Sequence, residues 1–177
     1  MNIHRIHDLS NSYVVDILHK GLQHSDLENY SPEFSSKNSN IFYILGTEGR
    51  YTNGAYFVLE KDGKYIASSG WNKYTDDTAL VLTRSFVSEE FRARYLMAEY
   101  LLPIMLNETS TFLHTWITCN KETETIYKWF SRANAGKTAA MFNNWPDIYR
   151  KFYPIGQREV NYTMQYVVEF DRNCNEY

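Results

Sequence analysis

The chain has 177 residues, of which 44% are hydrophobic and 22% charged, and its formal net charge is −3. This composition is typical of a globular protein, and the length allows one core, so we expect a single domain over residues 1–177 with a flexible tail at 171–177. Because no apolar run approaches the ~20 residues of a membrane span and the N-terminus lacks the apolar stretch of a signal peptide, we expect a cytoplasmic protein without membrane contact; the acidic balance gives no support for general nucleic-acid binding.

The N-terminal part of the chain carries weak local signals. Residues 2–7 (NIHRIH) are typical of a short strand. Ser10 or Asn11 can cap a helix through YVVDILHKGL, with Gly21 as its C-terminal stop. Residues 22–40 are polar and rich in Ser and Asn, which is typical of a loop.

A hairpin is the clearest local signal. The runs AYFVLE and KYIASSGW flank Asp62 and Gly63, and Asp-Gly is a preferred pair for a tight hairpin turn. A third strand, TALVLTRSFV over residues 78–87, follows the polar loop NKYTDD. We therefore expect three consecutive antiparallel strands.

The rest of the chain alternates helices and strands. FRARYLMAEYLL places Phe91, Tyr95, Ala98 and Leu102 at helical spacing, and Pro103 should kink or end that helix. TFLHTWITC predicts a strand, NKETETIYKWFSRA a helix, and VNYTMQYVVEF a closing strand. The order of elements predicts a mixed α/β fold around a central sheet.

Several of these stretches together resemble the GNAT acyltransferase family. LEKDGKYIASSGW resembles its second and third strands, and LTRSFVSEEFRARYL resembles its strand-four-to-helix segment, where the family motif is R-G-x-G-x-G/A. ITCNKETETIYKWF matches the family's Asn at the end of strand five followed seven residues later by Tyr, here Asn120 and Tyr127. The ending PIGQREVNYTMQYVVEF is similar to GNAT-like proteins encoded by tailed phages.

The resemblance implies an α/β (α+β) fold with a mixed central sheet of about six to seven strands, flanked by helices, in which strands four and five splay apart. Acetyl-CoA or another acyl-CoA would enter that wedge as co-substrate. Its pyrophosphate would rest on backbone N–H groups at the start of the central helix, which have no internal partner and lie at the positive end of the helix dipole. The implied cofactor-binding residues are Phe86, Val87, Arg92, Ala93, Arg94, Tyr95, Leu96 and Met97.

The helix start departs from the family pattern and has two interpretations. Aligning Arg92 with the motif arginine puts Ala93, Tyr95 and Met97 in the slots for small residues. In one interpretation Ser88 caps a helix that begins at Glu89. In the other, SEEF is an ordered loop, and a helix starting near Arg94 presents free N–H groups to the wedge.

The candidate catalytic residues lie on strand five and the following helix. The resemblance implies that Tyr127 reprotonates the leaving thiolate and that Asn120 orders the strand end. His114 lies on the same face of the strand as Asn120, by alternation, and is a candidate base. Neither the two cysteines nor the scattered histidines suggest a metal site.

The first hypothesis is therefore a GNAT-like N-acetyltransferase acting on an amine of a small molecule or a protein. One alternative is a GNAT-fold binding module without CoA chemistry. Another is a nucleobase- or DNA-modifying enzyme, because the segment from Lys128 to Arg158 holds six basic residues and one acidic residue, a patch that could meet phosphates.

Overall fold

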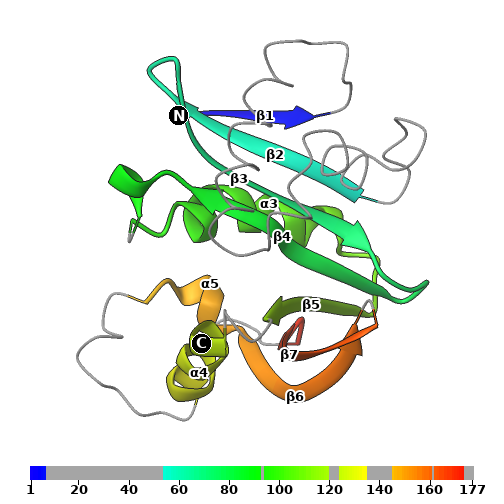
Figure 1. Ribbon diagram of the computed structural model, residues 1–177. Helices are drawn as coiled ribbons and strands as arrows, with labels where there is room; N and C mark the ends of the chain where they lie inside the picture. The colour runs from blue at the N-terminus through cyan, green and yellow to red at the C-terminus, as the bar shows by residue number, and fades with distance from the viewer. Residues whose placement is uncertain (7–53, 93, 120–123, 135–144, 161, 174–177) are drawn as a thin grey trace.

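The structure is a computed structural model that describes residues 1–6, 54–92, 94–119, 124–134, 145–160 and 162–173 (Figure 1). The helix expected before Gly21 and the loop expected over 22–40 lie outside these residues. In the described part of the chain, no helix is long and apolar enough to span a membrane.

Seven strands form one sheet in the order β1-β2-β3-β4-β5-β7-β6 (Figure 1). Every neighbouring pair is antiparallel except β4 and β5, which are parallel. The strands are β1 Asn2–Ile6, β2 Gly54–Lys61, β3 Lys64–Lys73, β4 Thr78–Val87, β5 His114–Cys119, β6 Phe152–Val160 and β7 Thr163–Phe170. The mixed α/β fold with a seven-stranded central sheet confirms the predicted fold class.

The predicted hairpin is confirmed. β2 and β3 pair from Gly54 with Asn72 to Lys61 with Lys64, and the two turn residues between them both have positive φ, 52° at Asp62 and 72° at Gly63. Two consecutive residues with positive φ make the type of turn whose twist suits a two-residue hairpin.

β4 follows β3 along its whole length but contains a bulge. Its register against β3 shifts on both sides of Gly70, and Leu82, which has a φ of 56°, has no partner between Val81 and Thr83. Ser85 Oγ donates to the Leu82 carbonyl oxygen at 2.9 Å. Ser69 Oγ lies 2.7 Å from Ser85 Oγ, so the bulge is fixed by a chain of hydroxyl groups.

The central helix starts later than predicted. The expected helix over 91–102 is replaced by a 3₁₀ turn at Glu89–Phe91, an extended Arg92, a π-helical segment Met97–Leu101 and then α3, Leu102–Glu108. The prediction of its first half was wrong because the aromatic spacing that suggested helix is satisfied by packing: Phe91, in the 3₁₀ turn, and Tyr95, before the helix, contact the core from outside an α-helix.

Pro103 neither ends nor interrupts the helical segment, which continues to Glu108. The Leu102 N–H bonds to the Met97 carbonyl five residues back, so the helix widens just before the proline. Pro103 then lies in the first turn of α3, where its missing N–H costs little.

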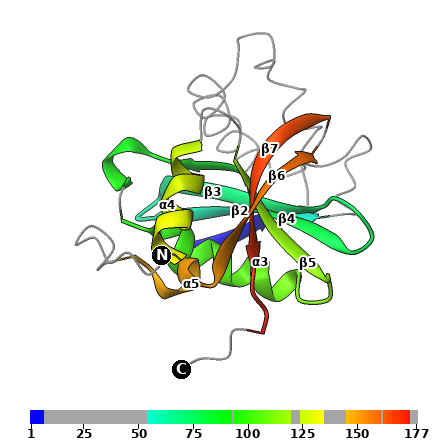
Figure 2. The ribbon, with the colours of Figure 1, turned by 90° about the horizontal axis from the view of Figure 1, so that it is seen from below.

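Two helices follow the central one. They are α4, Glu124–Asn134, and the short α5, Asp147–Arg150. α3 lies behind β2 to β4 in Figure 1 and on one side of the sheet in the view from below (Figure 2). α4 packs on the other half of the sheet, where Phe130 meets Phe152 of β6 with ring centroids 5.9 Å apart.

The sequence analysis missed β6, because Pro154 and Gly156 interrupt its apolar pattern. The ladder between β6 and β7 shifts at these two residues, and Gly156 has a φ of 85°. Val160, expected to open the last strand, ends β6 instead. Beyond β7, Arg172 is held in place: its guanidinium donates to the Thr109 carbonyl oxygen at 2.6 Å.

One hydrophobic core joins the two halves of the sheet. It includes Phe57 of β2, Leu101 and Met105 of the central helix, Ile117 of β5 and Phe152 of β6, none more than 5% exposed. Because α3 and α4 both contribute to this core, the two halves stay together even where the strands between them do not pair.

Candidate functional site

A wedge opens between β4 and β5. The two strands pair only from Thr78–His114 to Leu80–Trp116. Past Leu80, β4 bulges at Leu82 and stays on β3, while β5 continues on β7. In Figure 1 the strands lie together at the right and separate toward the left. We call this gap the wedge, and its open end, between Val87 and Cys119, the mouth.

The free edge of β4 presents backbone groups to the wedge. The Ser88 N–H donates to Ile66 on β3 at 2.9 Å, so by alternation the N–H and carbonyl groups of Val87 point the other way, toward the wedge. The Val87 carbonyl oxygen accepts a hydrogen bond from Arg92 Nε at 3.2 Å. Val87 and Arg92, both predicted to bind the cofactor, therefore meet at the mouth.

The start of the central helix lies beside the mouth. Glu99 N–H donates to the Tyr95 carbonyl at 3.0 Å, so the N–H groups of Leu96, Met97 and Ala98 precede the first intrahelical bond. Tyr95 has a φ of 54°, and Leu96 has right-handed angles of −54° and −35°. A left-handed residue followed by a right-handed one turns successive N–H groups toward one side, which forms a concave site for an anion.

The structure decides between the two interpretations of residues 88–94. Ser88 precedes only the three-residue 3₁₀ turn and makes no side-chain capping bond to it. The interpretation in which Ser88 caps a helix from Glu89 is therefore wrong. An ordered SEEF segment with a later helix start describes the backbone better, although the helix begins at Met97, three residues beyond Arg94.

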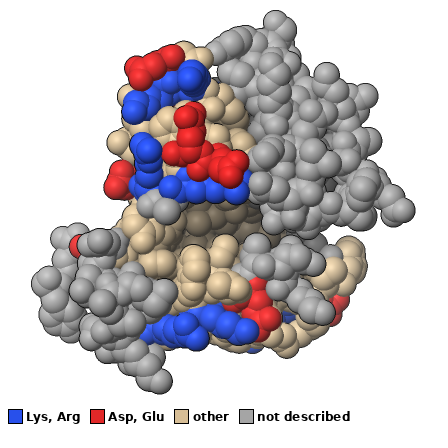
Figure 3. All heavy atoms as spheres, turned by 60° about the vertical axis from the view of Figure 1, so that its left-hand side comes forward, with Lys and Arg blue, Asp and Glu red and all other residues tan. Residues whose placement is uncertain are grey.

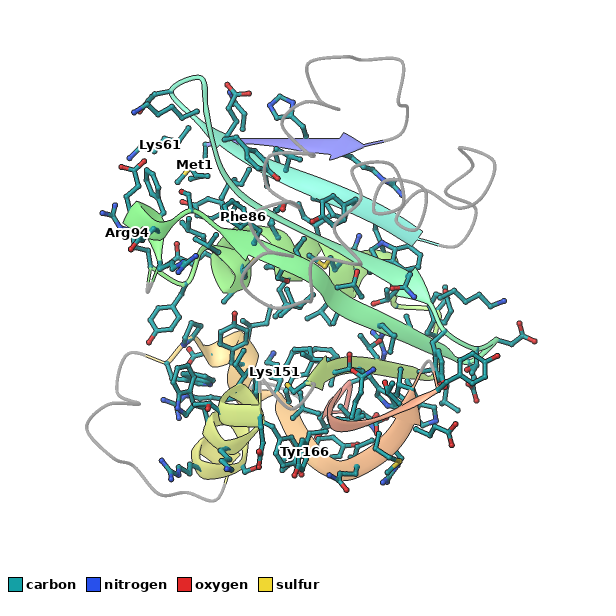
Figure 4. The ribbon with its side chains drawn as sticks, viewed as in Figure 1. Met1, Lys61, Phe86, Arg94, Lys151 and Tyr166 are labelled. Atoms are coloured by element: carbon teal, nitrogen blue, oxygen red, sulfur yellow. The ribbon has the colours of Figure 1, made fainter. Side chains whose placement is uncertain are left out.

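Charged side chains surround the upper side of the mouth. Arg94 lies over the Phe91 ring at 5.1 Å and Lys61 over the same ring at 5.7 Å, and Figure 4 shows both at the same end of the upper sheet half. Glu89 and Glu90 are exposed in the same region. Figure 3 looks at this side and shows a band of acidic and basic residues. Beneath the band lies a recess lined by residues other than Lys, Arg, Asp and Glu.

The side chains of Tyr95 and Met97 are buried to different extents. Met97 is 8% exposed, and it packs into the core together with the buried Leu96. Leu96 and Met97, both predicted to bind the cofactor, can therefore contribute to that binding only through their backbone N–H groups. Tyr95 is half-buried, and its ring meets Trp145 in a T-shaped contact with centroids 6.3 Å apart.

The backbone of Tyr95 explains why a glycine suits this slot. A φ of 54° is open to glycine, whereas a bulky residue held there carries strain of about 1–3 kcal/mol. The packing of the ring on the opposite half of the molecule offsets that strain. The Tyr149 hydroxyl lies near Tyr95: burial raises the pKa of Tyr149, and the neighbouring Tyr95 raises it further.

Tyr127 lies on α4 and contacts β7. Its ring centroid is 4.8 Å from that of Tyr166, and Tyr166 is the β7 residue opposite Cys119, the last residue of β5. Figure 4 shows Tyr166 near the lower edge of the molecule and Phe86 in its upper half. Phe86 lies on β4 and stacks on Tyr65, with centroids 6.4 Å apart.

His114 lies at the other end of β5. Its Nδ1 is 2.5 Å from Glu169 Oε1, and its backbone N–H bonds to the Asp77 carbonyl. It pairs with Thr78, where the wedge is closed, five residues or roughly 16 Å from Cys119. The structure therefore separates His114 from Tyr127. Two other predicted site residues, Asn120 and Ala93, lie outside the described residues.

Sequence reasoning missed three aromatic residues of the mouth: Trp145, Tyr149 and Tyr166. Trp145 and Tyr149 stand four residues apart, a spacing that could have marked them as one face, and their rings contact each other at 5.1 Å. Among the described residues, no group of three or more His, Cys, Asp or Glu side chains is arranged to hold a metal ion.

Comparisons by sequence identify no relative: no protein-family model matches the chain, and no curated protein matches it. Several solved structures nevertheless share its fold over nearly the whole length. A putative GNAT acetyltransferase from Desulfovibrio desulfuricans matches with a TM-score of 0.61 and 8% identity, covering 96% of this chain and 97% of that one. A point mutant of the spermidine N-acetyltransferase SpeG from Vibrio cholerae matches with a TM-score of 0.58 and 12% identity, covering 96% and 94%.

A third similar structure contains the expected ligand. The PaiA N-acetyltransferase from Thermoplasma acidophilum, in complex with coenzyme A, matches with a TM-score of 0.51 and 9% identity, covering 96% of this chain and 99% of that one. Identities this low establish similarity of fold alone. The chain therefore has the fold of the GNAT acetyltransferases.

Proposed function

We propose that this protein is an N-acyltransferase that moves an acetyl or another acyl group from acyl-CoA to an amine. The observation that carries the proposal is the wedge with the start of the central helix beside its mouth. Beyond Leu80, β4 and β5 no longer pair, and the N–H groups of Leu96, Met97 and Ala98 precede the first intrahelical bond. A free strand edge can pair with an amide-containing arm, and the N–H groups can bind phosphate.

The residues present fit acyl-CoA. The β4 edge offers backbone partners at Val87, and the backbone at Tyr95 and Leu96 forms the concave anion site. Arg92 and Arg94 are exposed at the same place and supply positive charge for phosphate oxygens. Acyl-CoA supplies the activated thioester.

Side chains of the protein would then orient the reactants and protonate the leaving thiolate. Acyl transfer needs a deprotonated amine, a polarised carbonyl and a proton for the leaving thiolate. Tyr127 is our candidate for the last role, because its ring contacts Tyr166, the β7 residue that pairs with Cys119 at the end of β5. His114 is bound to Glu169 at the closed end of the wedge, so we assign it no role in this step.

The fold supports a proposal for the class of amine that accepts the acyl group, and no more than a proposal. The similar structures include enzymes that are named for acetylating spermidine, so a small amine is the first acceptor to test. A protein amine is the second. The cytoplasmic location and the likeness to phage-encoded variants remain predictions from the sequence.

The basic segment gives less support to the nucleic-acid alternative than its composition suggested. Lys128 pairs with Glu124 at 3.0 Å, and Arg150 pairs with Asp147 at 3.5 Å. Both pairs reduce the charge available to phosphates. Nucleic-acid binding stays a prediction, which an affinity that falls steeply with added salt would support.

Titration with coenzyme A tests the proposal. We expect saturable binding by calorimetry and a stabilisation of about 2.7 kcal/mol when free coenzyme A reaches 100 times its Kd. Thiol release from acetyl-CoA should then depend on an added amine, with spermidine and short N-terminal peptides as the two acceptor arms. No binding at millimolar coenzyme A would overturn the proposal and favour a binding module.

Tyr127→Phe tests the catalytic assignment separately. We expect a fall in kcat of ten-fold or more with little change in coenzyme A affinity, because the phenol acts only when charge develops on sulfur. Tyr162→Phe is the matched control, since Tyr162 is 96% exposed between β6 and β7. An unchanged kcat would remove Tyr127 from the mechanism.

A further inference from the structure

The Tyr95 ring crosses the mouth of the wedge. Tyr95 lies two residues before the central helix, on the β4 side, whereas Trp145 lies two residues before α5, on the side formed by α4, α5 and β6. Their ring centroids are 6.3 Å apart, with the planes at 74°. This contact joins the two sides where β4 and β5 have ceased to pair.

The partner ring is firmly held. Trp145 is 8% exposed and contacts Phe130 at 5.5 Å, Tyr149 at 5.1 Å and Trp129 at 6.4 Å. A ring packed on so many sides cannot follow Tyr95 without disturbing α4 and α5. The packing of Trp145, on the opposite side of the mouth, therefore fixes the position of the Tyr95 ring.

The φ of Tyr95 also decides how its N–H group is oriented relative to the helix start. With Tyr95 at 54° and Leu96 right-handed, the Tyr95 N–H turns toward the same side as the N–H groups of Leu96 and Met97. A residue with a Cβ prefers negative φ, and relaxation to negative φ would turn the peptide that carries the Tyr95 N–H relative to the helix start. Glycine has no such preference. In this chain the contact between the Tyr95 and Trp145 rings holds the positive φ that a glycine would adopt without strain.

We propose that Tyr95 is a positioning residue for the acyl donor: by packing on Trp145 it holds the left-handed backbone that turns its own N–H, together with those of Leu96 and Met97, toward the donor's phosphates. This inference rests on the proposed function. It assigns Tyr95 no contact with the reacting atoms, so its effect belongs in donor affinity and in the KM for acetyl-CoA, and not in kcat at saturating donor.

Three substitutions at this position separate the possibilities. Tyr95→Phe keeps the ring, Tyr95→Gly loses the ring but adopts positive φ freely, and Tyr95→Ala loses the ring and keeps the Cβ that disfavours positive φ. By calorimetry with coenzyme A, we expect the Phe variant within three-fold of the wild type and the Ala variant at least ten-fold weaker. The Gly variant should bind more tightly than the Ala variant.

The order of the last two variants is the decisive readout. If Tyr95 mattered only for packing, the Gly variant, which removes more side chain, would bind no better than the Ala variant. Such a result would overturn the inference while leaving the proposed function intact. If the wild type itself does not bind coenzyme A, the proposed function and this inference both fail.

A second substitution tests the connection to Trp145. Trp145→Leu should weaken coenzyme A binding in the wild-type background but leave it unchanged in the Tyr95→Gly background, where no ring remains to be held. Melting temperatures of all four proteins show whether they stay folded. Equal losses of affinity in both backgrounds would mean general damage to the aromatic cluster, and would overturn the role of the contact.

Discussion

The two ends of β4 are held to the rest of the molecule by different means. At its first residues, Thr78 to Leu80, β4 pairs with β3 on one side and β5 on the other. At its last residues its strand partner among the described residues is β3, and beyond it side-chain contacts such as the one between Tyr95 and Trp145 reach the other half. The closed end is fixed by the backbone, whereas the geometry of the open end depends on particular side chains.

The polar groups follow the same division. The closed end carries compact local networks: Asp77 accepts from Thr75 and Thr78, and His114 meets Glu169. At the open end, backbone groups take part, since the Leu82 carbonyl accepts from Ser85 and the Val87 carbonyl from Arg92. A ligand can exchange partners with backbone groups at an open edge, but not with a strand that is paired on both sides.

Leu101→Ala should damage both ends at once, because Leu101 is fully buried in the core that joins the two halves. We expect a loss of about 2–5 kcal/mol in the free energy of unfolding, measured with denaturant. Leu113, 70% exposed just before β5, is the control, and Leu113→Ala should stay within about 0.5 kcal/mol. Equal losses for the two variants would contradict the shared core.

Gly70→Ala should destabilise the protein at the point where the closed and open ends of β4 meet. Gly70 stands at the register shift opposite the β4 bulge, and a Cβ there would lie 2.6 Å from the Ala55 carbonyl oxygen. Because that atom is backbone, β2 and β3 must move apart, and we expect a loss of about 1–3 kcal/mol.

The matched control for Gly70 is Gly63→Asn. Gly63 has open space around its Cβ position, and Asn tolerates its φ of 72°. We expect this variant to stay within about 0.5 kcal/mol of the wild type by the same denaturant measurement. A Gly70→Ala protein as stable as this control would show that the bulge region can adapt.

Ser85→Ala should loosen the open end alone. It removes the donor to the Leu82 carbonyl and the partner of the buried Ser69, so we expect a loss of about 0.5–1.5 kcal/mol. Hydrogen exchange should rise in residues 81–87 and stay unchanged in 78–80. Ser110→Ala, at an exposed position after α3, provides the comparison. Uniform exchange changes along β4 would argue against two separate ends.

Asp77→Asn should give the smallest effect, confined to the closed end and dependent on pH. Hydrogen bonds from Thr75 and then Thr78 lower the pKa of Asp77. A carboxyl group with a lower pKa in the folded state stabilises the protein above its unfolded pKa of about 3.9, and this is lost as the pH falls through the folded value.

Melting temperatures between pH 2 and 7 check this prediction. We expect the wild type to melt above Asp77→Asn at neutral pH, with the difference vanishing at the acidic end. Asp76→Asn, at the neighbouring exposed position, is the control. A difference that does not change with pH would assign the effect of Asp77 to packing rather than to its charge.

The strand predictions succeeded where neighbours in sequence are also neighbours in the sheet. The Asp62-Gly63 turn and the strand over 78–87 were predicted with little error, because turn chemistry and alternation act over a few residues. β6 was missed because Pro154 and Gly156 obscure its alternation, and the strand exists because β7 supplies its hydrogen bonds.

For the candidate site the sequence indicated segments but not their arrangement. The resemblance implied a cofactor site at 86–97, and the structure brings Val87 and Arg92 together at the mouth, beside the backbone N–H groups at the helix start. The sequence did not indicate that His114 would lie at the closed end of the wedge. Alternation predicts which face of a strand a residue lies on, and not its distance along the strand from another element.

The sequence by itself determined the hairpin, the order of strands and helices from β2 to α4, and the placement of a motif-like segment between β4 and the central helix, since each depends on contacts within a few residues. Only the tertiary structure decided where that helix begins and how Tyr95 comes to have a positive φ. Local preference places Tyr95 at negative φ, and a ring contact with Trp145, fifty residues further along the chain, accompanies the opposite choice.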